Sequence, residues 1–296
     1  MTYSHSARDG RVEIVVLTYN RPHELMQTLE QLTRLPERPQ IHVIDNGSAQ
    51  PVEALIGRQF PEVDCLHLSH NIGAAARNAG VEIATSPYVA LCDDDTWYEA
   101  GSLRRAAEIL DAYPKVAVLT ARVVIEPDGR LDPTCAEMAH SPLPSDSLPG
   151  PGLLGFLAGA SVVRSAAFLG CGGFEPRFFL GGEEELLTLD LRAAGWRLAY
   201  VDELCVHHAP SPLRDAGTRR RLLLRNALWV AWLRRPWPVV LQSTLRLGLD
   251  AVRDATSRRA LLSALRGVPW SLRRRRALPR DLEAEVRLLE RDRASR

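Results

Sequence analysis

The chain has 296 residues, of which 46% are hydrophobic and 25% are charged, and its formal net charge is +1. This length suits one large α/β domain with an appendage, and the composition excludes fibrous and wholly disordered proteins. The five cysteines are scattered and lack paired spacing, which excludes a disulfide framework or a zinc site and indicates reduced thiols in a cytoplasmic protein.

The first ten residues form a polar N-terminal tail without an apolar stretch, so no secretory signal is expected. The chain contains no window of about 18 uninterrupted apolar residues, the length that a transmembrane helix needs. We therefore expect a cytoplasmic protein, either soluble or peripheral on the inner face of the membrane.

Short apolar runs alternate with helical periodicity through the first hundred residues. Strands are predicted at Val12–Leu17, Ile41–Ile44, Val63–Leu68 and Tyr88–Cys92, with helices at His23–Leu35 and within Asn71–Ala84. This alternation predicts parallel βαβ units, in which ligands bind beyond the carboxyl ends of the strands. The polar clusters TYNR, DNGS, HNIG and DDD each follow one strand, so four segments are expected to converge on one rim.

The second half of the chain predicts fewer regular elements. A strand is expected at Val116–Ile125, and Glu126–Gly152, rich in Pro, Ser and Asp without periodicity, is expected to be a mobile loop. A helix is predicted at Glu183–Ala194 and a last strand at Trp196–Val206, before His207 and His208. Beyond Thr218 the pattern is helical and is interrupted by prolines.

Positive charge is concentrated at the C-terminal end. From Thr218 to Arg296 the chain has 20 arginines against 7 acidic residues. Such a segment suits anionic lipid or nucleic acid, or it forms a solvated helical face that packs on the acidic remainder of the chain. We favour packing and expect no nucleic acid partner.

The stretch Leu222–Trp237 (LLLRNALWVAWLRRPW) places three tryptophans beside arginines. It has two interpretations of equal weight. It forms an amphipathic helix in a membrane interface, or it packs against the rest of the protein.

Asp93, Asp94 and Asp95 are consecutive carboxylates at a predicted strand end. Gathering them costs like-charge repulsion and desolvation unless a cation offsets both. Carboxylate oxygens suit Mg²⁺ or Mn²⁺, which often share their coordination with substrate phosphates. In an extended backbone Asp93 and Asp95 would project to one side and serve one metal site, while Asp94 would reach a different group. The alternative is an exposed acidic turn.

A second acidic cluster, Glu183, Glu184 and Glu185, follows two glycines. It suits a helix N-terminus, where the dipole favours negative charge, or a general base in a partly dry pocket. The pair His207 and His208 lies on the surface or is hydrogen-bonded in the core, or else it supplies the imidazole that completes an oxygen-rich divalent metal site.

Asn71, Gly73 and Arg77 suit either a diphosphate-binding turn, with backbone donors and a guanidinium, or an ordinary turn into a helix. The stretch contains neither the Walker motif nor GxGxxG.

Taken in order, these segments resemble the family 2 glycosyltransferases of the GT-A fold, from about Glu13 to Ser211. The matching stretches are VVLTYNRP, VIDNGS, NIGAAARNAG, ALCDDDTW, GFLAGASVVR, GGFEPRFFLGGEEELL, LRAAGWRLAYV and VHH. The resemblance implies a Rossmann-like α/β fold with a mixed, mainly parallel sheet flanked by helices. It places a GT-A catalytic domain at residues 11–217 and a basic, mainly helical extension at residues 218–296.

The resemblance also implies roles for individual residues. Those expected to bind the nucleotide or donor are Thr18, Tyr19, Asn20, Arg21, Asp45 (to the pyrimidine base), Asn71, Gly73, Arg77, Asp93, Asp94, Gly159 and Ala160. Asp93 and Asp95 match the ends of the DxD motif whose metal bridges the donor diphosphate. His208 matches the family's histidine, and His207 is the alternative metal ligand. The metal would be Mn²⁺ or Mg²⁺.

Glu184 falls where the family places its catalytic carboxylate. The family often has an acidic residue and then Leu after the Glu pair, whereas Leu186 and Leu187 follow Glu185 here. The register is therefore open, and Glu183 or Glu185 could be the base instead.

The activity that the resemblance implies is inverting transfer of a sugar, of the hexosyl or deoxyhexosyl class, from a nucleoside diphosphate sugar to an acceptor hydroxyl in cell-envelope or polysaccharide biosynthesis. UDP or dTDP is the expected nucleotide, and the acceptor is a glycan, a lipid-linked molecule or a small molecule. The alternatives are a nucleotide-sugar-binding protein without catalysis and a nucleotidyltransferase, which would need a Gly-rich, Lys/Arg-bearing phosphate loop that TYNRP does not supply.

Overall fold

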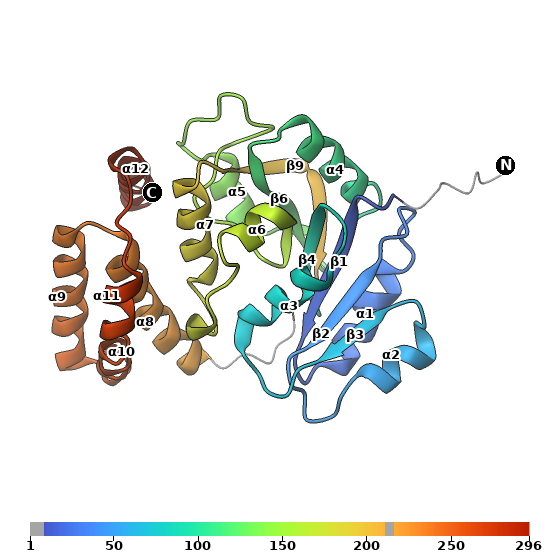
Figure 1. The fold of residues 1–296 in the computed structure, drawn as a ribbon, viewed down its shortest axis with the longest axis horizontal. Coiled ribbons are helices and arrows are strands. Elements are labelled where there is room, and N and C mark those ends of the chain that lie inside the picture. The colour runs from blue at the N-terminus through green and yellow to red at the C-terminus, as the bar shows by residue number, and fades with distance from the viewer. Residues whose placement is uncertain (1–8, 211–215, 296) are drawn as a thin grey trace.

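A computed structural model describes residues 9–210 and 216–295, so most of the predicted tail of residues 1–10 lies outside the described residues. The described residues form a nine-stranded sheet in the order β3-β2-β1-β4-β8-β6-β9-β5, with β7 paired to β6 (Figure 1). The strands are β1 (Val12–Thr18), β2 (Ile41–Asp45), β3 (Asp64–His67), β4 (Tyr88–Asp93), β5 (Thr96–Tyr98), β6 (Val116–Ile125), β7 (Arg130–Leu131), β8 (Ala160–Arg164) and β9 (Arg197–His208).

The pairing pattern gives a mixed sheet in which most strands share one direction. The pairs β1–β2, β1–β4, β2–β3 and β6–β9 are parallel, whereas β8, β5 and β7 run antiparallel to their neighbours. β1 and β4 are buried along almost their whole length, as their β-branched and aliphatic residues require in a sheet covered on both faces. The carboxyl ends of β1, β2, β3 and β4 therefore meet at one edge, which confirms the predicted rim.

Helices cover both faces of the sheet. The helices of this part of the chain are α1 (Pro22–Leu32), α2 (Glu53–Gln59), α3 (Ala76–Ile83), α4 (Ser102–Ala112), α5 (Pro133–Ala139), α6 (Ser165–Gly170) and α7 (Glu183–Ala193), with short 3₁₀ turns η1 (Gly73–Ala75) and η2 (Pro176–Phe178). α3 packs on β1 and β2 and against α6, and α6 packs against α7. α1 and α4 lie on β5 and β9, respectively. The predicted α/β architecture is confirmed.

The expected mobile loop at Glu126–Gly152 is wrong in part. Its first half forms β7 and α5, and Asp132 caps α5 by accepting a hydrogen bond from the backbone N–H of Thr134 at 2.8 Å. Pro133 at the first turn needs no N–H partner. The sequence Asp-Pro-Thr was thus a helix start inside a segment whose composition suggested only a loop.

The C-terminal extension is helical, and its first helix packs on α7. Its helices are α8 (Ala216–Arg234), α9 (Trp237–Arg253), α10 (Ala255–Leu265), α11 (Val268–Arg274) and α12 (Arg280–Ser295). Their apolar cluster includes residues of the body, namely Phe178 of η2 and Leu186 and Leu189 of α7 beside Trp229 and Trp232 of α8, and it is separate from the larger core around the sheet. The prolines that were expected to interrupt the helical pattern lie in the first turn of a helix or just before it, as Pro238 does in α9.

This packing accounts for the central part of the stretch Leu222–Trp237. Leu228, Trp229 and Trp232 are buried, and the indole N–H groups of the two tryptophans donate to the Ala264 carbonyl and the Thr244 hydroxyl. These residues of the stretch therefore pack in a protein core, as the second interpretation expects, whereas Leu223 and Trp237 are 44% and 56% exposed. Within the described residues, no helix has the length and apolar character that a membrane span requires.

Ion pairs join the extension to the body. Arg234 of α8 makes a bidentate pair with Asp190 of α7, at 2.5 and 2.8 Å, and Arg192 of α7 contacts Glu285 of α12 at 2.5 Å. Some of the positive charge of the extension is thus used in packing.

Candidate active site

A cleft of about 600 Å³ opens at the carboxyl edge of the parallel strands. The predicted site residues that line it are Thr18, Tyr19, Arg21, Asn71, Gly73, Arg77, Asp93, Asp94, Gly159, Ala160, Glu183, Glu184 and His208. They come from strand ends, loops and α7, as many as 190 positions apart in the chain. Asn20, Asp45, Asp95, Glu185 and His207 do not line the cleft.

Side-chain amides hold the loops around this cleft in place. Asn46 Nδ2 donates to Asn71 Oδ1 at 3.0 Å, and Asn46 Oδ1 accepts from the backbone N–H of Ile72 at 2.9 Å. Asn20, whose φ of 54° lies in the left-handed region, accepts from the backbone N–H of Ala49. The loops after β1, β2 and β3 are therefore fixed to one another before any ligand binds.

Asp45 takes part in this fixed arrangement rather than in the cleft surface. It is fully buried, its oxygens accept from the backbone N–H groups of Ser48 and Val52, and Oδ2 lies 3.0 Å from His67 Nδ1. Both oxygens are occupied by these contacts. Asp45 therefore does not line the cleft, whereas its neighbour Asn46 does.

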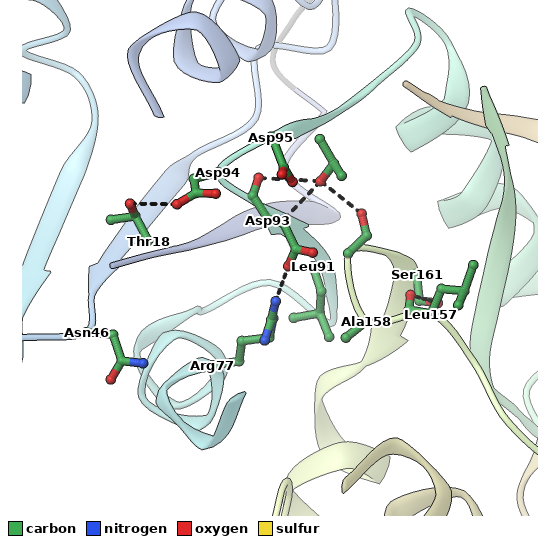
Figure 2. Close-up of polar contacts among 12 residues, drawn as sticks. Thr18, Asn46, Arg77, Leu91, Asp93, Asp94, Asp95, Leu157, Ala158 and Ser161 are labelled. Carbon is green, nitrogen blue, oxygen red and sulfur yellow. Dashed lines mark hydrogen bonds and ion pairs between the residues drawn. The ribbon is translucent and has the colours of Figure 1, made fainter. Parts of the chain in front are cut away.

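The three aspartates point in different directions (Figure 2). β4 ends at Asp93, and the chain turns through Asp94 and Asp95 before β5. The expected alternation of an extended backbone is therefore wrong at this position. Asp93 forms an ion pair with Arg77, whereas Asp94 and Asp95 both pair with Arg21, at 2.5 and 2.9 Å.

Two arginines thus offset much of the repulsion within the triplet. Asp94 is nearly inaccessible, and it also accepts a hydrogen bond from the hydroxyl of Thr18 at 2.9 Å. Burial nevertheless raises the pKa of Asp94 to about 7, because Arg21 only partly compensates for the loss of water. Asp93 is the aspartate that reaches the open cleft, with 42% of its side chain exposed.

The glutamate triplet begins α7, and its members occupy different environments. Glu183 is buried, Glu184 is half-buried and faces the cleft, and Glu185 is exposed on another side of the helix. Glu184 Oε1 lies 3.3 Å from the backbone N of Ala158, which donates to it. Burial raises the pKa of Glu184 to about 7, and the negative charge of Glu183 acts in the same direction.

The two histidines lie on opposite faces of β9. His208 lines the cleft, and its Nε2 lies 3.7 Å from Asp95 Oδ1. His207 stacks on Trp97 and its Nδ1 lies 2.8 Å from Glu126 Oε1. With Glu99 and Cys205 it forms the group of three potential ligands found among the described residues. The structure therefore brings His208, and not His207, to the aspartates.

Two glycines allow backbone to approach the site closely. A Cβ at Gly159 would lie 2.7 Å from Asp93 Oδ2, so a larger residue would displace this carboxylate. Gly73 has a φ of +69°, and a Cβ there would lie 1.9 Å from the carbonyl oxygen of Phe179. The chain at Phe179–Gly181 can therefore lie directly against the turn before α3 and line the cleft.

The loop Phe179–Gly181 is held by a residue of α8 that was not predicted from the sequence. Asn226 of α8 is fully buried, and its Nδ2 lies within hydrogen-bonding distance of the carbonyl oxygens of Phe178, Leu180 and Gly181, at 2.9, 3.1 and 2.5 Å. Arg225 donates to the Phe178 carbonyl as well. The available signal was a lone asparagine within the apolar run LLLRNALWV. Asp132 and Arg219, which also line the cleft, were missed too.

The chain is similar in sequence to known proteins of one family. The model of glycosyl transferase family 2 matches residues 13–166. The succinoglycan biosynthesis protein ExoM of Rhizobium meliloti is 30% identical over 256 residues, which are 78% of this chain and 80% of that protein. The pre-mycofactocin glycosyltransferase of Mycobacterium tuberculosis is 31% identical over 220 residues, which are 71% of this chain but only 45% of that enzyme.

Solved structures share the fold at low sequence identity. The mannosyltransferase PcManGT of Pyrobaculum calidifontis, in complex with GDP-Man and Mn²⁺, superposes with a TM-score of 0.56 at 18% identity and covers 90% of this chain and 74% of that one. GalNAc-T7 with UDP, GalNAc and Mn²⁺ gives a TM-score of 0.59 at 15% identity, covering 76% and 48%. These neighbours have the GT-A type of sheet, as the sequence predicted.

Proposed function

Since the chain belongs to glycosyl transferase family 2, we propose that it moves a sugar from a nucleoside diphosphate sugar to an acceptor hydroxyl with inversion at the anomeric carbon. The observation that carries this proposal is the meeting of Glu184 and Asp93 in one cleft with Arg77. A carboxylate for deprotonation and a charged region for a diphosphate are the two elements that such a displacement requires. We assign the catalytic domain to residues 11–217 and the helical extension to residues 218–296.

Glu184 is the proposed general base. It accepts the proton of the acceptor hydroxyl while the hydroxyl oxygen attacks the anomeric carbon, and the bond from that carbon to the diphosphate oxygen breaks. A pKa of about 7 suits this role, because the carboxylate is then basic enough to take a proton while about half of it is ionised at neutral pH. Glu183 is buried and Glu185 is exposed away from the cleft, which favours Glu184 within the triplet.

Asp93 and His208, which line the cleft, are the residues that would hold a Mn²⁺ or Mg²⁺ ion, together with Asp95, which lies beside His208 outside the cleft lining and pairs with Arg21. Two carboxylates and an imidazole suit either metal, and the 3.7 Å between His208 Nε2 and Asp95 Oδ1 brings two of the three donors together. The ion would supply positive charge to the leaving diphosphate. Arg77, now paired with Asp93, is the protein's own cation at this point and would share that charge.

The donor is proposed to lie along the loops after β1, β2 and β3, with its nucleotide near Thr18, Tyr19 and Asn71 and its sugar near Gly159 and Ala160. We favour UDP or dTDP as the nucleotide from the family resemblance. For the acceptor we propose a glycan or a lipid-linked sugar. The names of two relatives support this, since one is named for a decaprenol diphosphate acceptor and another for succinoglycan biosynthesis.

The test is a donor screen followed by two substitutions. Nucleotide sugars are incubated with the protein and Mn²⁺ or Mg²⁺, and donor hydrolysis or transfer is measured as released nucleoside diphosphate. Asp93→Asn and Glu184→Gln should abolish release while circular dichroism stays unchanged. Near-normal turnover in either variant would refute its role. Donor binding without turnover in the unaltered chain would identify a nucleotide-sugar-binding protein instead.

A further inference from the structure

The outer helix of the extension exposes a continuous apolar stripe. Trp237, Leu241, Leu245, Leu249 and Val252 of α9 are 56%, 61%, 67%, 72% and 77% exposed. Their spacing of three and four residues places them along one side of the helix. The figure shows α9 at the edge of the molecule, beyond α8, α10 and α11 (Figure 1).

This stripe is separate from the face that α9 buries. Val240, Leu247 and Ala251 are the buried residues of the helix and belong to its packing side. One apolar face is enough to hold a helix on a protein core, and a second face of large aliphatic side chains left in water lowers solubility. Isolated exposed leucines are ordinary, but five large apolar residues in line on one helix indicate a partner surface.

The charges beside the stripe identify that surface. Arg246 and Arg253 are exposed and lie three residues before and four residues after Leu249, so they flank the stripe on one side, and Asp250, also exposed, is the acidic residue of α9. The neighbouring α10 contributes exposed Arg258 and Arg259. An apolar stripe flanked by arginines suits a membrane interface. The leucines would contact acyl chains there, and the guanidinium groups would pair with anionic headgroups.

A second copy of the chain fits the stripe of α9 less well than a membrane does. In a symmetric dimer the same stripe would face itself, and the flanking arginines of the two copies would lie against each other. Like charges in such an arrangement oppose association, whereas an anionic lipid surface attracts both sets. We propose that α9 docks the protein on the surface of an anionic membrane, with the stripe Trp237–Val252 in the headgroup region.

The experiment uses the full chain and vesicle flotation. Vesicles of phosphatidylcholine with phosphatidylglycerol should carry the protein to the top of a density gradient, and vesicles of phosphatidylcholine alone should carry much less. Leu245→Gln with Leu249→Gln should lower the partition coefficient by about tenfold or more, because burial of one leucine is worth roughly a factor of ten in an equilibrium constant. Arg246→Gln with Arg253→Gln should lower binding to the anionic vesicles and reduce its dependence on salt.

The matched control is a pair of exposed apolar residues elsewhere. Ile83 and Leu66 are 44% and 36% exposed in the body of the protein, and Ile83→Gln with Leu66→Gln should leave flotation unchanged. Circular dichroism checks that all variants keep their helices. Failure of the unaltered chain to float, or equal flotation of the Leu245/Leu249 variant, would overturn the proposal. A concentration-dependent dimer in light scattering that this variant abolishes would assign the stripe to a second copy instead.

Discussion

Glu184, the proposed general base, lies in an environment that disfavours its charged form. The half-buried carboxylate has the backbone N–H of Ala158 as a donor, and the charge of Glu183 next to it adds to the effect of burial. A base must be ionised to accept a proton, so kcat/KM should rise with pH through about 7 and level off above it. A pH–rate profile measures this. A profile that is flat between pH 5 and 8 would contradict the assignment.

Substitution within the triplet separates the base from its neighbours. Glu184→Gln should lower kcat by about 10² to 10⁴ and remove the pH dependence, because the amide cannot accept the proton. Glu185→Gln is the matched control, since Glu185 lies in the same turn of α7 but is exposed outside the cleft. It should retain activity and the same profile.

The same raised pKa has a consequence for stability. The folded protein holds a proton on Glu184 up to about pH 7, whereas the unfolded chain releases it near the ordinary value of 4.5. The free energy of unfolding therefore falls as pH rises from about 4.5 to about 7. Glu184→Gln removes this loss, so the Tm of the variant should exceed that of the unaltered protein at pH 8 and match it at pH 4. Equal Tm values at both pH values would show that the carboxylate is not held in a low-polarity environment.

Gly159 tests how closely the backbone must approach Asp93. In Gly159→Ala the new Cβ would meet the Asp93 carboxylate at 2.7 Å, and the carboxylate would have to rotate away. We expect at least a tenfold loss of kcat/KM and a higher Mn²⁺ concentration for half-maximal activity, with little change in Tm, because only a flexible side-chain end moves. Gly155→Ala is the control, since a Cβ there meets no atom within 4 Å. Equal activity of both variants would show that the position of Asp93 does not matter.

At the scale of elements, the loop before α7 depends on a residue of α8. Asn226→Asp keeps the shape of the side chain but replaces its donor by an oxygen that faces the carbonyls of Phe178, Leu180 and Gly181. The free energy of unfolding should fall by about 1–3 kcal/mol, the cost of unsatisfied buried polar groups. The loop leads directly into Glu183 and Glu184, so kcat should fall more than the donor KM rises. Gln242→Glu, an exposed amide of α9, is the control.

That prediction fails if Asn226→Asp keeps full kcat while its Tm drops. Such a result would make Asn226 a purely structural residue. Recovery of kcat by restoring Asn in the same background would exclude an accidental second change.

The same scale shows what sequence alone could supply. The strands before the rim were predictable, because continuous β-branched and aliphatic runs such as VEIVVL are typical of strands in a sheet that is buried on both faces. The directions of Asp93, Asp94 and Asp95 were not, because they depend on the turn into β5, a strand of three residues that pairs with β9. Local patterns carry no information about such a partner, which lies more than a hundred positions away.

At the scale of the molecule, the extension packs on η2 and α7 of the body through an apolar cluster that is separate from the core around the sheet. Phe178, Leu186 and Leu189 of the body pack with Leu228 and Trp229 of α8, and the Arg234–Asp190 pair spans the same junction. Composition suggested two separate regions because charge changes sign near Thr218. Such packing is not visible in composition, since it depends on which helix faces meet.

This shared cluster predicts cooperative unfolding of the whole chain. Scanning calorimetry should show a single transition, because melting α8–α12 would expose Leu186, Leu189 and Phe178 to water. Leu189→Ala on the body side and Leu228→Ala on the extension side should each cost about 2–5 kcal/mol and move that same transition down by several degrees. Leu272→Ala, an exposed leucine of α11, should leave it in place. Two transitions, with Leu228→Ala shifting only one of them, would mean that the extension folds by itself and that Asn226 holds the catalytic loop across a separable interface.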